Sequence, residues 1–185
     1  MALPEFLMKT SEALGAAPIG GGLAGSETLE FTEQHQEQDQ WCWAAVSVSV
    51  SHFYDAASTW TQCDLVNAEL NRSDCCWNGS TSQCDRPWNL NSPLSRTQNL
   101  NTMDNSAALF ADLISEIDNR RPIGCRIGWF AGGGHFVVIH GYSTSGGQWV
   151  TVGDPFYGPS TYSYDGFCSA YRNSGEWTHT YNTQA

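Results

Sequence analysis

The first residue able to act as a nucleophile is a cysteine between two tryptophans. Residues 38–55 read QDQWCWAAVSVSVSHFYD, and the thiol is that of Cys42. Valines and serines alternate after it, which is typical of a half-buried β-strand. The run from Cys42 to Ala57 is longer than an ordinary strand, however, and Ala44 and Ala45 favour a helix. We therefore expect an α-helix that begins at Cys42.

A cysteine at the start of a helix has a chemical advantage over a cysteine inside a strand. The helix dipole and the free backbone N–H groups of the first turn stabilise a thiolate. A thiolate that attacks a substrate also needs a base, and the base needs a group that orients it. Cys42 is therefore a candidate nucleophile if those two partners occur elsewhere in the chain.

Two downstream residues have the required types and positions. His135 follows Gly132 to Gly134 and opens the segment HFVVIHGY, and Asp154 ends the segment WVTVGDP. Both segments predict strands, and neighbouring strands of this length can bring Asp154 to the His135 ring. His140 is expected to point to the opposite face of the sheet. Each residue alone is more often structural, but together they predict a nucleophile, a base and an orienting acid.

The elements that must position these residues change from helical to extended along the chain. Helices are expected over residues 42–57, 64–70 and 105–119, the last being amphipathic and ended by Pro122. Residues 71–101 are polar and are expected to lack regular structure. Strands are expected over residues 123–130, 135–142, 148–152 and 177–181. Helices followed by strands indicate an α+β fold in two lobes.

Three segments of the chain resemble the signature blocks of papain-like cysteine peptidases. They are QWCWAA, GGGHFVVIHGY and VTVGDPFYG, within residues 34–158. They are most similar to the bacterial branch that contains the avirulence-effector proteases and, more distantly, to the double-glycine bacteriocin-processing peptidases. The resemblance implies a helical lobe that carries the cysteine, packed on an antiparallel β-sheet lobe that carries the histidine and the aspartate. It places the active cleft between the lobes.

The same resemblance assigns roles to individual residues. Cys42 would be the nucleophile, His135 the base and Asp154 the orienting acid. A glutamine upstream of the cysteine, here Gln36, would join the Cys42 backbone N–H in an oxyanion hole. Its neighbours Gln38 and Gln40 are competitors for that role, and we interpret them as solvated loop residues.

The activity that the resemblance implies is peptide-bond hydrolysis through a thioester acyl-enzyme. We expect a protein or peptide substrate, a monomer, and neither a cofactor nor a metal. An acyl transferase or a deamidase could use the same three residues, because they do not decide whether water or an amine accepts the acyl group. An inactive, disulfide-stabilised binding module is a third hypothesis.

The other six cysteines are Cys63, Cys75, Cys76, Cys84, Cys125 and Cys168. Their even number predicts three disulfides, which would imply secretion or another oxidising compartment. Four of them crowd into residues 63–84, where little hydrophobic pattern would otherwise hold the chain. A zinc site is the alternative, but adjacent cysteines at 75 and 76 fit the usual zinc-binding spacing poorly.

Composition excludes several classes of partner. The chain has 185 residues, a net charge of −11 and only eight Lys plus Arg. Nucleic acids and anionic membrane surfaces are bound mainly by cationic side chains, so we expect neither as a partner. No apolar stretch is long enough to span a membrane.

The amino-terminal residues differ from the rest of the chain. Residues 1–30 are rich in glycine and are expected to form a flexible arm, which the resemblance suggests could be a processed leader; a plain linker is the alternative. No secretory signal is visible in them. We expect a single papain-like domain over residues 31–185.

Overall fold

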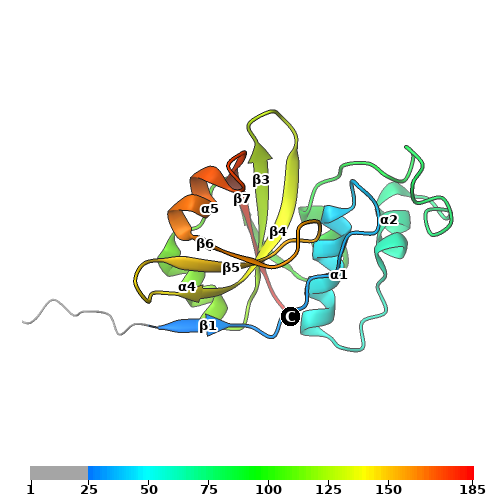
Figure 1. Cartoon of the computed structure of the whole chain (residues 1–185). Coiled ribbons are helices and arrows are strands. Elements are labelled where there is room, and N and C mark those ends of the chain that lie inside the picture. The colour runs from blue at the N-terminus through cyan, green and yellow to red at the C-terminus, as the bar shows by residue number, and fades with distance from the viewer. Residues whose placement is uncertain (1–24) are drawn as a thin grey trace, which may run out of the picture.

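Two groups of elements make up residues 25–185, the part of the chain that the computed structural model describes (Figure 1). The helices are α1 (Cys42–Tyr54), α2 (Gln62–Leu70), α3 (Asn91–Arg96), α4 (Phe110–Asp118) and α5 (Tyr164–Ala170). The strands are β1 (Ser26–Thr28), β2 (Leu100–Asp104), β3 (Ile123–Trp129), β4 (Gly134–Ser143), β5 (Trp149–Gly153), β6 (Ser160–Ser163) and β7 (Gly175–Thr183). An α+β architecture results, with a helical region before a seven-stranded antiparallel sheet. None of the described helices has the length and hydropathy needed to cross a membrane.

Helix α1 explains the strand-like pattern that follows Cys42. Every residue from Cys42 to Ser51 is buried, so the helix has no solvent-exposed face over this stretch. The serines fit because their hydroxyls bond within the helix: Ser47 Oγ donates to the Trp43 carbonyl at 2.8 Å and Ser49 Oγ to the Ala45 carbonyl at 2.7 Å. The prediction of a helix starting at Cys42 is therefore confirmed, although the helix ends at Tyr54 rather than Ala57.

The sheet places the start of β4 and the end of β5 near the start of α1. Its strand order is β2-β7-β3-β4-β5-β6, and β1 pairs with β4. Strands β3 and β4 form a hairpin in which Ile127 lies opposite His135. The β4–β5 register shifts between Ile139 and Gly141, which marks a bulge. In Figure 1, α1 and α2 lie on one side of the central strands, and α4 and α5 lie on the other.

Five elements differ from the sequence predictions. Residues 71–101 were expected to be irregular, but they contain α3 and the start of β2. Strand β2 is largely exposed and therefore lacks an apolar alternation. Strand β6 and helix α5 were not predicted; both are short, and α5 begins at a side-chain cap from Ser163 to the Gly166 N–H. Helix α4 begins at Phe110, later than the predicted residue 105.

The expected arm lies mostly outside the described residues, which begin at residue 25. Within it, Ser26–Thr28 form β1 and pair with β4, Thr28 lying opposite Gly141. A Cβ at Gly141 would lie 2.7 Å from the Thr28 Oγ1, so only glycine allows this close approach. The sheet therefore begins within the range predicted for the arm. The arm and its boundary with a domain at residue 31 stay predictions.

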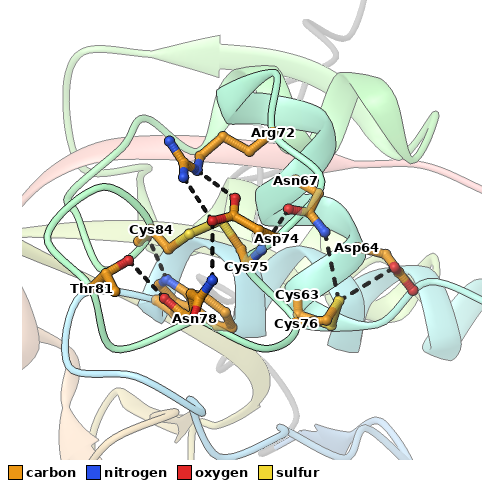
Figure 2. The surroundings of a disulfide bond; sticks show 11 residues. Cys63, Asp64, Asn67, Arg72, Asp74, Cys75, Cys76, Asn78, Thr81 and Cys84 are labelled. Atoms are coloured by element: carbon orange, nitrogen blue, oxygen red, sulfur yellow. Dashed lines mark hydrogen bonds and ion pairs between the residues drawn. A yellow bond between two sulfur atoms is a disulfide. The ribbon is translucent and has the colours of Figure 1, made fainter.

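Two disulfides cross-link the segment between α2 and α3 (Figure 2). They join Cys63 to Cys76 and Cys75 to Cys84. Polar contacts order the same segment. The Asp74 carboxylate accepts two hydrogen bonds from the Arg72 guanidinium, at 2.9 and 2.8 Å, and one from the Asn78 side-chain amide. The disulfide interpretation of these four cysteines is confirmed.

The prediction that Cys125 and Cys168 are also paired is wrong, because both are free thiols in the described structure. Cys125 lies on the central strand β3 with no exposed surface, and burial raises the pKa of its thiol well above the usual value. Cys168 lies on α5, where burial likewise raises its pKa. A buried cysteine can act as a small apolar core residue, so an even count of cysteines did not imply three bonds.

Candidate active site

Cys42 is the first residue of α1 and lies at the base of an open cleft. Its side chain is a free thiol and only 8% of the residue is exposed. Among residues 25–185, no recorded hydrogen bond uses the Cys42 backbone N–H. The positive end of the helix dipole and this free donor both favour negative charge beside the thiol.

The disulfide-linked segment holds the tryptophans on either side of Cys42. The Trp41 indole donates to the Cys84 carbonyl at 2.9 Å, and the Trp43 indole donates to the Arg86 carbonyl at 3.2 Å. Both indoles are almost fully buried. The first turn of α1 is thus fixed from outside by a loop that the Cys75–Cys84 bond closes.

His135 is held by Asp154 and by two aromatic side chains. Its Nε2 lies 2.8 Å from Asp154 Oδ1. The Trp129 ring stacks on it at a centroid distance of 5.9 Å, and Tyr157 packs edge-on at 6.1 Å. Burial favours the neutral ring, but the hydrogen bond to Asp154 and the neighbouring Cys42 side chain outweigh it and raise the pKa of His135 to about 9. This environment therefore favours an imidazolium beside the thiol.

Asp154 follows β5 and receives four hydrogen bonds. Its Oδ1 accepts from His135 and from the backbone N–H groups of Phe156 and Tyr157, at 2.8 and 2.9 Å. Its Oδ2 accepts from the Tyr171 hydroxyl. Burial favours the neutral acid, but these bonds outweigh it and lower the pKa of Asp154. The carboxylate can therefore stay charged and fix the His135 ring.

Sequence reasoning missed Tyr171, which supplies the buried partner of Asp154. The residue follows α5, which was itself not predicted, and its surroundings in the sequence carry no motif. Burial and the neighbouring Asp154 raise the pKa of the Tyr171 hydroxyl, so it remains a donor. Trp129 was likewise missed, since a strand-end tryptophan gives no sign of stacking on a histidine.

Gln36 lies in the same cleft as Cys42 but has its amide donors occupied. Its Nε2 donates to the carbonyls of Gln38 and Asp39 at 2.8 and 2.7 Å, and its Oε1 is buried without a partner. Its backbone N–H donates to the Pro155 carbonyl at 2.9 Å, which ties it to the segment after Asp154. To donate to a substrate oxygen, one Nε2 hydrogen would have to leave a backbone carbonyl.

Gln40 also lines the cleft at Cys42, whereas His140 lies elsewhere. The His140 ring contacts Phe31 at a centroid distance of 5.5 Å, and burial lowers its pKa. The rings of His135 and His140 therefore have different neighbours.

Two adjoining cavities open at Cys42. The larger, of about 400 Å³, is lined by Gln36, Cys42, His135 and the aromatic residues Trp129, Phe156 and Tyr157, among others. The smaller cavity, of about 180 Å³, is lined by Trp43, Trp88 and Phe136, among others. Cys42, Gly133 and Gly134 line both, so the thiol lies where the two meet. A chain that ran through both cavities would pass over the sulfur.

A thiol at a helix start, a histidine beside it and a helical region packed on an antiparallel sheet are features of papain-like cysteine proteases. The family model described as papain-like cysteine protease AvrRpt2 matches residues 24–172. The chain therefore belongs to this family, as the three sequence blocks predicted. No curated protein matches the chain significantly.

Proposed function

We propose that the chain hydrolyses peptide bonds in protein substrates, with Cys42 as nucleophile, His135 as base and Asp154 as orienting acid. One observation carries this proposal: the His135 ring bonds Asp154 and lines the same open cleft as the Cys42 thiol. Family membership supports the protease activity itself.

The reaction would run through an acyl-enzyme. Cys42 transfers its proton to His135, and the thiolate attacks the substrate carbonyl carbon. The C–N bond breaks as His135 returns the proton to the leaving amine, which leaves a thioester on Cys42. A water molecule, deprotonated by His135, then attacks the thioester, and the C–S bond breaks to release the acid and the thiolate.

The negative oxygen formed during each attack needs donors. The free Cys42 backbone N–H is one, and Gln36 is the proposed second. In this proposal an Nε2 hydrogen of Gln36 exchanges its backbone acceptor, on Gln38 or Asp39, for the substrate oxygen.

The proposal extends to the setting of the enzyme. Two disulfides are compatible with an oxidising compartment, and we propose that the protein acts there, after secretion, as a monomer. The alternatives share the site but differ in product: a deamidase releases ammonia, a transferase joins an amine, and a binding module changes nothing.

Mass spectrometry of peptides released from a mixed proteome separates these hypotheses. We expect new peptide ends with the wild type and none with Cys42→Ala. A mass change without new ends would instead support transfer or deamidation.

The site variants test the individual roles. His135→Ala should lower turnover by at least about a thousandfold. The loss in Asp154→Ala should be roughly tenfold smaller than the loss in His135→Ala, because the thiol and the imidazole keep some activity without the orienting acid. His140→Ala, which contacts Phe31 instead, is the control and should keep most activity. Equal loss in the His140 and His135 variants, with both folded, would contradict the assignment.

A further inference from the structure

Glu33 is a half-buried residue whose carboxyl group the proposed chemistry does not use. It lies in the extended segment that joins β1 to α1. Its side chain packs against Gly153, the residue before Asp154: a Cβ there would lie 3.0 Å from the Glu33 Cβ and 3.4 Å from its Oε2. The Oε2 atom is buried and has no hydrogen-bond partner. A charged oxygen in such a place would be strongly destabilising.

The other carboxyl oxygen meets Ser49, in the middle of α1. Ser49 Oγ lies 3.0 Å from Glu33 Oε1, 2.7 Å from the Ala45 carbonyl and 2.8 Å from the Gln34 backbone nitrogen. The hydroxyl has a single proton. If it donates that proton to the closer Ala45 carbonyl, the bond to Glu33 needs a proton from Glu33 itself. In that arrangement Glu33 is a protonated carboxylic acid that donates to Ser49.

We infer that Glu33 is a positioning residue of the proposed active site: as a neutral acid it donates to Ser49 and holds α1, which begins with Cys42, against Gly153 and so against Asp154. The inference rests on the proposed function of that site. It adds a contact between the helix of the nucleophile and the strand end of the orienting acid, away from the cleft.

Charge around Glu33 agrees with this assignment. Burial raises the pKa of Glu33 to about 8. A hydrogen bond donated by Ser49 lowers this pKa, whereas one donated by Glu33 to Ser49 favours the neutral acid. Among charged groups, Asp154 raises the pKa and His135 lowers it. Once ionised, Glu33 has no proton for Ser49 and adds a second negative charge behind Asp154. The contact between α1 and Gly153 must then open to admit water, and Cys42 moves relative to His135.

An infrared spectrum tests the protonation state directly. Exposed carboxyl groups are ionised at pH 7. The Cys42→Ala protein, which cannot digest itself, should still show the carbonyl band of a protonated carboxylic acid, and adding Glu33→Gln should remove it. A spectrum without this band at pH 7 would overturn the inference, whether or not the protein is a protease.

The rate at which iodoacetamide alkylates Cys42 tests positioning without a substrate. At pH 7, Glu33→Gln should react within about threefold of the wild type, because the amide can also donate to Ser49. Glu33→Ala should react roughly 10- to 100-fold more slowly, as expected when reacting groups lose alignment. Peptide mapping identifies the alkylated cysteine. Equal rates in all three proteins would overturn the inference.

The pH profile of turnover separates positioning from general support of the fold. The kcat of the wild type should fall as pH rises through about 8, where Glu33 ionises. The kcat of Glu33→Gln should fall about one pH unit higher, near the pKa of about 9 of His135. Glu30→Gln, at an exposed acid of the same segment, should follow the wild type. Identical profiles for the wild type and Glu33→Gln would overturn the inference. Absence of any Cys42-dependent cleavage would instead refute the proposed function. The alkylation and infrared results would then decide whether Glu33 is a neutral acid that positions Cys42.

Discussion

At the scale of single residues, the site combines groups that the sequence reveals with groups that it does not. Cys42, His135 and Asp154 could be picked out because their residue types and places at element ends suit one reaction. Tyr171 and Glu33 act on Asp154 from segments without a motif, and only the folded chain brings them to it. The predictable residues are the proposed nucleophile, base and orienting acid, and the unpredictable ones surround them.

Tyr171 offers a test at this scale. Tyr171→Phe keeps the buried ring but removes the donor to Asp154 Oδ2. Because a hydrogen bond to a charged group contributes about 1.5 to 3 kcal/mol, we expect the free energy of unfolding to fall by that amount. Urea unfolding of the Cys42→Ala protein with and without this change measures it. Tyr162→Phe is the control, since no hydrogen bond of its hydroxyl is recorded in the described chain; a similar loss there would contradict the role given to Tyr171.

At the scale of elements, the length and burial of each element decide whether its sequence pattern could predict it. Helix α1 shows no helical periodicity because all of its first residues are buried, and its length had to identify it. Strands β3, β4 and β5 are rich in apolar residues and separated by glycines, so they could be predicted. Helix α3 and strands β2 and β6 are short or exposed. Strand β2 pairs with β7, which is distant in the sequence, whereas β6 pairs with the adjacent strand β5.

The two disulfides should differ in their effect on the site. Cys75 and Cys84 are buried, and the Cys84 carbonyl accepts from Trp41, whereas Cys76 is exposed. Replacing Cys75 and Cys84 by alanine should lower the free energy of unfolding by about 2 to 5 kcal/mol and slow peptide cleavage, because Trp41 loses its fixed acceptor. The matched pair Cys63→Ala/Cys76→Ala should leave cleavage nearer the wild-type rate. Unfolding curves and kcat of both double variants are the measurements, and a greater loss of kcat in the second would contradict this role.

At the scale of the whole molecule, the proposed site lies where the segment that leads into α1 meets two strands distant from it in the sequence. The segment before α1 supplies Gln36 and Glu33, the start of α1 supplies Cys42, and the sheet supplies His135 and Asp154. A single cluster of buried side chains joins the helical region to the sheet. The order of helices and strands predicted this division of labour, but the packing of residues 29–41 across both parts left no periodic pattern to predict.

The pH dependence of stability tests this arrangement in the intact molecule. The folded chain raises the pKa of His135 from 6.5 to about 9, so the protonated ring stabilises the fold fully below about pH 6.5, and this contribution is lost as pH rises towards 9. In the Cys42→Ala protein the hydrogen bond to Asp154, which is the largest single cause of the rise, remains. Its free energy of unfolding should therefore fall with pH above 6.5 relative to Cys42→Ala/His135→Ala, by at most about 1.4 kcal/mol per pH unit. Urea unfolding of both proteins between pH 6 and 9 measures the difference. If the two curves stay parallel, His135 does not hold its proton more tightly in the folded chain, and the ion pair with Asp154 at the centre of the proposed mechanism is absent.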